Sequence, residues 1–293
     1  MGKIKTGKLR KFQLFDVFVY IFLILFAIII FVPFFSCVMI SFTTEKEILE
    51  SSFLLIPSEW TLSSYQEILS NSQIGSGFIV SIVITYFGTA FNMLLTILAA
   101  YAFSKPKFPF RKILYFLFIF TMFFGGGLIP NYLLIKDLGL VDNLLSLILP
   151  TGLSMFNMIL MKTYFEGLPK ELSEAATIDG AHELTILVHV LLPLCAPSLA
   201  TICLFYAVDR WNDWFNAMLY INTDTLYPLQ LVVRNIVNTA TSKEIITQVG
   251  SVRVYGEGIK MATVFVVMLP MMLVYPFLQR FFMKGITLGA VKG

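Results

Sequence analysis

The sequence predicts an all-α polytopic protein that crosses a membrane six times, with both ends of the chain inside the cell. Hydrophobic residues make up 57% of its 293 positions and charged residues only 13%, whereas a soluble domain has about 25% charged residues. The apolar residues gather into six runs, each near the length of roughly twenty residues that a helix needs to cross a bilayer. Lys and Arg are unevenly divided between the segments that join the runs.

Residues 1–16 form a basic cytoplasmic tail, and the first apolar run, 17–44, follows it directly. No small-residue cleavage site follows this run, so we interpret it as a retained helix rather than a signal peptide. The tail contains a G-x-x-x-x-G-K pattern from Gly2 to Lys8, but Leu9 stands where a nucleotide-binding loop needs Ser or Thr. The chain is therefore expected to bind no nucleotide itself.

The other five runs complete a single membrane domain over residues 17–293. Three successive glycines at 125–127 and Pro130 interrupt the third run, and they predict a point of close packing or a hinge. The expected spans after the first are 78–103, 113–135, 143–161, 196–221 and 261–279.

The distribution of Lys and Arg sets the orientation, because cytoplasmic segments are enriched in both. With the N-terminus inside, the segments on the cytoplasmic side carry fourteen of these residues and the loops on the outer side carry five. We therefore expect both termini inside. This arrangement places the segment 163–193 in the cytoplasm and the long polar loop 222–257 outside.

The segment 163–193 is polar, favours helix formation and lies between two hydrophobic runs. Pro169 suits the first turn of a helix, and Gly180 suits a helix end that needs positive φ. A second short helix is expected over 182–192, with Pro193 interrupting it. The spacing puts four residues on one face of the first helix, with Glu174 beside them: Leu172, Ala175, Ala176 and Asp179. Such a surface suits docking into a groove of a partner protein.

Glu174-Ala175-Ala176, followed by Gly180 and then by Leu192-Pro193, is similar to the EAA loop of ABC-importer permeases. The longer string from Glu174 to Pro197 resembles the sugar-importer branch, in particular the smaller permease of the maltose type. One departure is Leu187, where the family usually has an aromatic residue. Three further stretches resemble the subgroup that imports oligosaccharides from complex polysaccharides: 125–140, 211–215 and 282–293.

This resemblance implies a type I ABC-importer permease in the cytoplasmic (inner) membrane that is not itself catalytic. Its expected partners are a second related permease in a heterodimer, two ATPase subunits, an extracytoplasmic solute-binding protein and an oligosaccharide, with no nucleic acid. ATP and Mg would bind to the ATPase subunits, and this chain would hold no cofactor. The residues implied in coupling to the ATPase are Leu172, Glu174, Ala175, Ala176, Asp179, Gly180 and Pro193.

The fifth run carries charged residues, which are costly at membrane depth and usually face a bundle interior or water. Helical spacing predicts one polar stripe made of Asp209, Asn212, Asp213, Asn216 and Tyr220. Arg210 lies at the edge of this stripe and could reach Asp213. Two interpretations stay open. The stripe could line the solute pathway, because carboxylates and amides suit a hydroxyl-rich sugar, or it could be an ion-pair and hydrogen-bond network that fixes the helix.

The loop 222–257 is long for a connection between neighbouring helices, and long loops are often functional. The resemblance implies that it could reach into the binding protein's cleft, and the alternative is a loop packed on the partner permease. If the loop does reach into the binding protein, residues 238–252 should be needed for docking or transport.

Rival functions find less support in the sequence. A secondary transporter working without an ATPase would usually show inverted repeats, and none is apparent. An intramembrane enzyme would need a convergent polar pair on two helices. His182-Glu183 begins a zinc-protease motif, but Ile186 stands where the second His belongs. The three cysteines lack metal-ligand spacing and fit as small apolar fillers. An importer of a solute other than a sugar also remains open.

Overall fold

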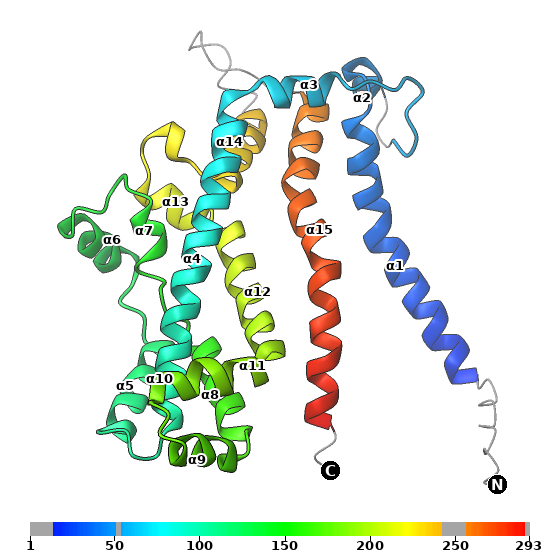
Figure 1. Cartoon of the computed structure of the whole chain (residues 1–293). Coiled ribbons are helices and arrows are strands. Elements are labelled where there is room, and N and C mark those ends of the chain that lie inside the picture. The colour runs from blue at the N-terminus through cyan, green and yellow to red at the C-terminus, as the bar shows by residue number, and fades with distance from the viewer. Residues whose placement is uncertain (1–13, 51–53, 242–255, 291–293) are drawn as a thin grey trace. The chain divides into compact units, whose positions relative to one another are not determined.

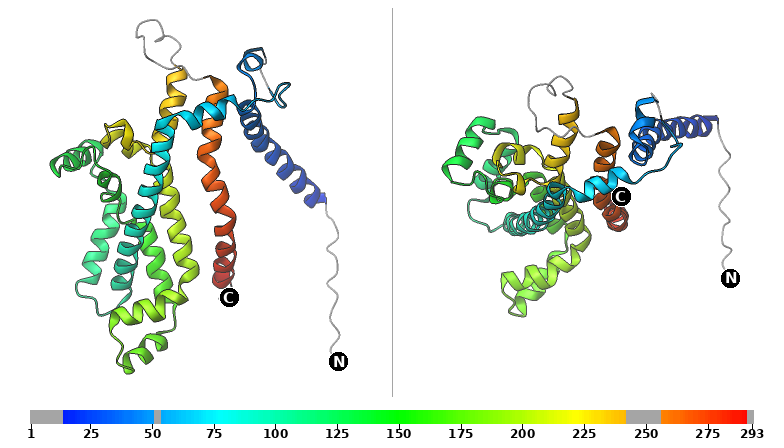
Figure 2. Two further views of the ribbon diagram at one scale, coloured as in Figure 1. Left: turned by 45° about the horizontal axis from the view of Figure 1, so that its top comes forward. Right: turned by 90° about the horizontal axis from the view of Figure 1, so that it is seen from above.

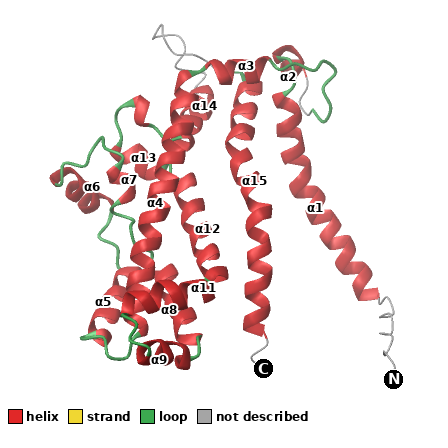
Figure 3. Ribbon diagram, in the orientation of Figure 1, coloured by secondary structure: helices red, strands yellow, loops and turns green. Residues whose placement is uncertain are grey.

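A computed structural model describes residues 14–50, 54–241 and 256–290, and these residues are mostly helical without a β-strand (Figure 3). The chain divides into two compact units. The first holds residues up to 68 together with 255–265, and the second holds 69–254 together with 266–293. The stretch 238–252 lies mostly outside the described residues.

The first unit contains α1 (Leu14–Ser41), α2 (Glu45–Glu50), most of α3 (Ser63–Ser70) and the beginning of α15 (Glu257–Ala290). Side-chain hydroxyls tie the end of α1 to the chain that follows it: Ser36 Oγ donates to Leu54 O at 2.9 Å, and Ser41 Oγ lies 2.7 Å from Tyr65 Oη. These bonds satisfy polar groups where the apolar run ends.

The second unit is assembled on α4 (Ser72–Ser104), which packs against α12, α8, α14 and α7. Both views show α12 running beside α4 (Figures 1 and 2). The other helices of this unit are α5 (Arg111–Phe123), α6 (Leu128–Asp137), α7 (Leu145–Ile148), α8 (Met155–Gly167), α9 (Lys170–Ile178), α10 (Glu183–Thr185), α11 (Leu192–Leu194), α12 (Ala196–Asn212), α13 (Phe215–Tyr220) and α14 (Leu229–Thr241). A π-helical turn covers Ile186–Leu191, and a 3₁₀ turn covers Asp224–Leu226.

Two apolar clusters hold this unit together. One surrounds the C-terminal end of α4, where Tyr101 and Phe103 meet Met158 of α8 and Leu187 of the π-helical turn. The other surrounds the N-terminal half of α4, where Ile84 meets Leu147 and Tyr220. Helices α8 to α11 therefore lie at one end of α4, with α13 and α14 toward the other (Figure 1).

Three helices of the described residues are long and apolar enough to cross a membrane: Phe15–Ser41, Ser72–Ser104 and Glu257–Pro276. They match the first, second and sixth expected spans. Two bent pairs could each make a further broken span. The described residues therefore do not contain six continuous spans.

The third, fourth and fifth expected spans are broken, each for a local reason. α5 and α6 meet at 115° across the glycines, where Gly127 has φ of +86°. The fourth span stops after α7 because Pro150 has no N–H and restricts the residue before it. The fifth stops at Asn212, where Asp213 Oδ1 accepts from Asn216 N at 3.2 Å and so competes with continuation of the helix, and α13 follows from Phe215.

The expected polar loop 222–257 is partly helical. Its described portion contains α14, whose apolar side chains Leu229, Leu231, Val232 and Ile236 are buried. Leu229 N donates to Ser81 Oγ of α4 at 2.8 Å. This part of the loop is packed on the chain itself.

Candidate functional site

The segment 163–193 folds as a helix, a tight turn and a second helical stretch. Gly180 follows α9 with φ of +80°, the left-handed conformation expected of a glycine at this place. Gly180 N donates to Thr177 O, and Ala181 N donates to Ala176 O, which closes the end of the helix. The second stretch runs through Pro193 without stopping there, and the chain bends by 87° after Leu194. Pro193 is therefore tolerated in the first turn of α11.

Most of the expected face of α9 is exposed, since Leu172, Ala175 and Asp179 all lie on the surface. Glu171, Glu174, Ala175 and Ile178, at helical spacing, are all exposed, and Ile178 keeps 86% of its surface accessible. Ala176 instead packs toward the apolar cluster at the end of α4. The expected face of Leu172, Ala175, Ala176 and Asp179 is thus split, because Ala176 serves close packing within this chain.

The π-helical turn that follows packs against the membrane helices. Leu187 is only 2% exposed and sits in the apolar cluster with Tyr101 and Met158. Leu187 thus makes an apolar contact without an aromatic ring. One end of the segment 163–193 offers an uncovered surface, and the other end is fastened to α4 and α8.

Arg210 is buried beside the break between α7 and α8, with 5% of its surface exposed. Its two terminal nitrogens donate to five acceptors: Leu147 O, Ile148 O, Thr151 O, Thr151 Oγ1 and Asn92 Oδ1. The Asn92 bond measures 3.0 Å and the bond to Thr151 O measures 2.9 Å. No ion pair joins Arg210 to Asp209 or Asp213 in the described residues. The expected contact with Asp213 is wrong, because the carbonyls freed at the end of α7 take the guanidinium hydrogens.

Four of the five residues of the expected stripe line one polar cavity of about 560 Å³: Asp209, Asn212, Asp213 and Asn216. Thr151, Ser154 and Tyr206 also face this cavity. The fifth residue, Tyr220, is buried in the apolar cluster and stacks on Tyr132 with ring centroids 6.2 Å apart. Tyr220 leaves the stripe because the helix breaks at Asp213, which changes the register of everything after it.

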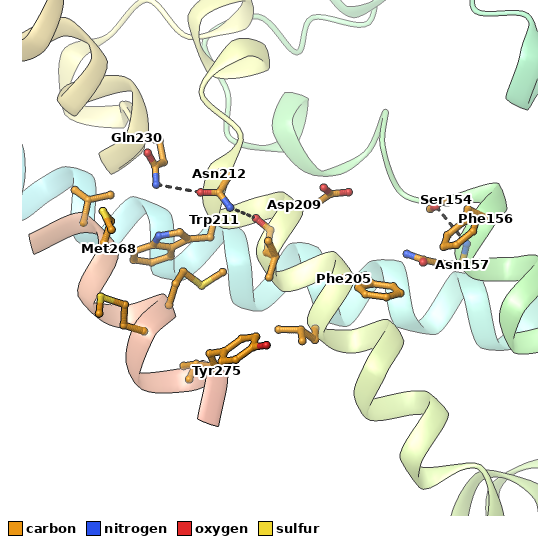
Figure 4. Close-up of a pocket in the computed structure, with 16 residues that line it drawn as sticks. Ser154, Phe156, Asn157, Phe205, Asp209, Trp211, Asn212, Gln230, Met268 and Tyr275 are labelled. Carbon is orange, nitrogen blue, oxygen red and sulfur yellow. Dashed lines mark hydrogen bonds between the residues drawn. The ribbon is translucent and has the colours of Figure 1, made fainter. Parts of the chain in front are cut away.

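Figure 4 shows the lining of a larger cavity of about 830 Å³. This cavity shares Ser154, Asp209 and Asn212 with the polar one. Asn212 accepts from Gln230 Nε2 at 3.3 Å and donates to Val208 O at 2.9 Å. The buried Trp211 indole N–H has no acceptor among the described residues. Further residues that the sequence analysis did not single out complete the wall: Phe205 of α12 itself, and Asn157, Gln230, Met268 and Tyr275 of other helices. Amides, a carboxylate and aromatic faces at one apolar cavity are the groups a sugar ring can use.

Gly88 of α4 gives Arg210 its space. A Cβ atom added at Gly88 would stand 3.0 Å from Nε and 3.1 Å from Cδ of Arg210. We expect Gly88→Ala to lower stability by about 1–3 kcal/mol, the usual cost of overpacking, and to lower the melting temperature of the chain purified in detergent.

Gly75→Ala is the matched control, because Gly75 lies in the same helix with nothing within 4 Å of an added Cβ. It should be neutral or slightly stabilising, since alanine favours a helix over glycine by about 1 kcal/mol. Equal melting temperatures for the two variants would contradict the packing of Arg210 against Gly88.

Comparisons with known proteins give a consistent result, although no protein-family model matches the chain. The chain is 41% identical over 290 residues to the polygalacturonan/rhamnogalacturonan transport system permease protein YtcP of Bacillus subtilis, covering 97% of this chain and 100% of that protein. It is 30% identical to the inner membrane ABC transporter permease protein YcjP of Escherichia coli, covering 92% and 94%.

The fold agrees with these relatives. A chain from the crystal structure of a bacterial ABC transporter involved in the import of the acidic polysaccharide alginate superposes with a TM-score of 0.85. That chain is 30% identical, and the match covers 95% of this chain and 100% of it.

Proposed function

This chain belongs to the sugar permeases of ABC importers, and from that premise we propose that it imports oligosaccharides cut from acidic polysaccharides. It is an integral membrane protein and a transport subunit rather than an enzyme. The observation that carries the proposal is the 41% identity, over the whole chain, with the polygalacturonan/rhamnogalacturonan permease. The likeness to a chain of the alginate importer supports the same class of solute.

The assembly we propose contains this chain and a second, related permease as a heterodimer. Two ATPase subunits bind ATP and Mg, and a solute-binding protein delivers the oligosaccharide from outside. The chain spans the membrane six times with both ends inside, and its broken segments count as spans. The charge distribution of the sequence supports this orientation.

Coupling in this proposal works through α9. ATP binding closes the two ATPase subunits. The exposed face of α9, which carries Glu174 and Ile178, is docked in a groove of one ATPase subunit and moves with it. The π-helical turn and α11 pass the motion to the membrane helices, since Leu187 is packed into their core. The membrane half then opens outward to receive the solute.

The polar cavity is the part of the pathway that this chain supplies. Asp209 and Asp213 accept hydrogen bonds from sugar hydroxyls, and the amides of Asn212 and Asn216 add donors. The terminal nitrogens of Arg210 are committed to the chain's own acceptors, so its guanidinium does not serve a uronate carboxylate. The cations that balance an acidic sugar therefore come from the second permease.

The direct test is ATP turnover in proteoliposomes. The chain would be co-expressed with its genomic neighbours, and the purified complex would be given binding protein loaded with a galacturonate oligomer. We expect stimulated ATP hydrolysis and uptake of this oligomer, and weaker responses to a neutral oligosaccharide. Preference for the neutral sugar would overturn the proposal that the substrate is acidic. Uptake by the chain alone without ATP would overturn the proposal of an ATP-driven importer and favour a secondary transporter.

Neutralising the cavity carboxylates tests the pathway. Asp209→Asn and Asp213→Asn should each lower uptake of the preferred sugar roughly ten-fold, because a hydrogen bond to a charged group contributes about 1.5–3 kcal/mol. Asn can still cap a helix, so α13 should stay in place. Asp137→Asn, at the exposed end of α6, is the control. Unchanged uptake of every solute tested by Asp213→Asn would remove Asp213 as a solute contact.

A further inference from the structure

Glu183 connects the first turn of α10 with the C-terminal end of α4. The Tyr101 hydroxyl donates to Glu183 Oε2, and it also lies 3.3 Å from the backbone oxygen of Glu183. Lys105, which caps α4, places its Nζ 2.9 Å from the same carboxylate oxygen. One carboxylate therefore receives two donors from one helix end, and its backbone is held as well.

The three side chains are arranged so that each restrains the others. Lys105 Nζ lies 4.6 Å from the centre of the Tyr101 ring, a cation–π contact that keeps the ammonium beside the hydroxyl. Tyr101 is itself buried and packs edge-on against Phe165 at 6.0 Å. Its hydroxyl is thus held in a fixed position by the core. The hydrogen bond from Tyr101, together with that from Lys105, holds the pKa of Glu183 below its ordinary value, so the carboxylate is charged at neutral pH.

The contact contributes little to the stability of the fold. Glu183 keeps 61% of its side-chain surface exposed, and ion pairs in such surroundings contribute about 0–1 kcal/mol. Its position is more informative than its strength. α10 begins directly after the turn at Gly180, and α4 is the helix against which α7, α8, α12 and α14 pack.

We propose that Glu183, Tyr101 and Lys105 form a latch through which movement of the segment 163–193 reaches α4. This inference rests on the proposed function, because it assigns a connection within the same coupling segment. With the latch closed, α10 and the end of α4 move as one body, so the second transmembrane helix follows the ATPases together with α12. With the latch open, movement of α9 is absorbed at the Gly180 turn and in the π-helical turn, whose backbone hydrogen bonding departs from the regular helix.

The test is the number of solute molecules taken up per ATP hydrolysed by the complete importer in proteoliposomes. The probe is the galacturonate oligomer on its binding protein. Glu183→Ala and Tyr101→Phe should each lower this ratio by about three- to five-fold, the fold-change that matches the upper part of the energy range of such a contact, with assembly and basal ATP hydrolysis unchanged. Tyr101→Phe removes only the hydroxyl and keeps the packed ring.

A charge exchange separates coupling from simple loss of a side chain. Lys105→Glu alone should lower the ratio by placing two carboxylates together, and Lys105→Glu with Glu183→Lys should restore most of it. Glu257→Ala is the matched control, because it removes a similar ion pair, Glu257 with Lys260, in the other compact unit. This control should keep the wild-type ratio.

Three outcomes would overturn the latch: a ratio within two-fold of the wild type for Glu183→Ala, no rescue by the charge exchange, or loss of assembly in both Glu183→Ala and Tyr101→Phe, which would make the contact structural. If the wild-type importer ignores the galacturonate oligomer, the proposed solute fails and the latch is tested by distance instead. Spin labels at Thr177 of α9 and Ser76 of α4 should then keep nearly the same separation on trapping with ATP and vanadate, and Glu183→Ala should make this separation change, because α9 then moves without α4.

Discussion

Replacing Glu174 by lysine is expected to abolish solute uptake while the chain still folds and enters the membrane. Glu174 is exposed on α9 and has no hydrogen-bond or ion-pair partner among the described residues. The fold therefore does not depend on it. The resemblance to the EAA loop implies that Glu174 meets a basic residue in a groove of the ATPase, and losing such a charge pair in a closed interface costs about 2–5 kcal/mol. Reversal adds repulsion, so docking should weaken at least roughly thirty-fold.

Two measurements separate the ways in which Glu174→Lys could fail. Co-purification of the ATPase with the permease reports docking, and uptake in proteoliposomes reports coupling. Loss of the ATPase from the complex, or ATP hydrolysis that no longer responds to loaded binding protein, would each agree with the prediction. Normal assembly together with normal uptake would refute it.

The control is the same reversal one turn earlier, at Glu171. Both residues lie on the exposed face of α9, so Glu171→Lys makes an equal change in net charge and in local field. Glu171 stands in the first turn of the helix, where reversal costs about 0.3–1 kcal/mol through the helix dipole. We expect Glu171→Lys to keep at least half of the uptake. If Glu171→Lys lowers uptake as much as Glu174→Lys does, the loss of uptake is caused by the overall charge of the exposed face and not by Glu174 in particular.

The sequence predicted several local features correctly. Positive φ at Gly180 followed from its place after a run of helix formers, and the long spans α1, α4 and α15 followed from uninterrupted apolar runs. The length of an apolar run shows how many residues avoid water. It does not show whether they form one helix. For this reason the prediction of a single continuous helix for each of the third, fourth and fifth runs is wrong.

The partner of Arg210 illustrates what local reasoning misses. The nearest carboxylates in the sequence, Asp209 and Asp213, seemed the natural counter-charges. The guanidinium instead reaches Leu147, 63 residues earlier in the chain. The signal that could have found this arrangement was Pro150, which ends a helix inside an apolar run and leaves carbonyls that need donors. Only the tertiary fold shows which donor arrives.

The same limit applies to the large cavity. Asp209 and Asn212 were identified from helical spacing, but Asn157 of α8, Gln230 of α14 and Tyr275 of α15 were not. Each is a single polar or aromatic residue in an apolar run, a pattern that fits many buried positions. Their meeting at one cavity depends on how four helices pack, and that depends on contacts far apart in sequence.

Replacing Arg210 by methionine is expected to prevent stable folding of the chain. The carbonyls of Leu147 and Ile148, at the end of α7, would lose the guanidinium that donates to them. Each unsatisfied carbonyl costs about 1–3 kcal/mol, and Asn92 Oδ1 also loses a donor. The total approaches the whole stability of many domains, about 5–15 kcal/mol. Fluorescence-detected chromatography of the detergent-solubilised chain should show mainly aggregate.

Arg210→Lys and Arg234→Met show whether the fork of donors is what matters. Lysine supplies one compact ammonium, which cannot reach the end of α7, Thr151 and Asn92 at once, so Arg210→Lys should recover only part of the folded peak. Arg234 lies 3.8 Å over the Trp214 ring on the surface, a contact that contributes about 0.5–1 kcal/mol, so Arg234→Met should fold normally. A folded Arg210→Met with wild-type yield would mean that the break between α7 and α8 has another source of donors. Both interpretations, solute pathway and hydrogen-bond network, would then be open again for Arg210. Aggregation of Arg210→Met would instead assign Arg210 to the network and leave Asp209 and Asp213 as the candidate solute contacts.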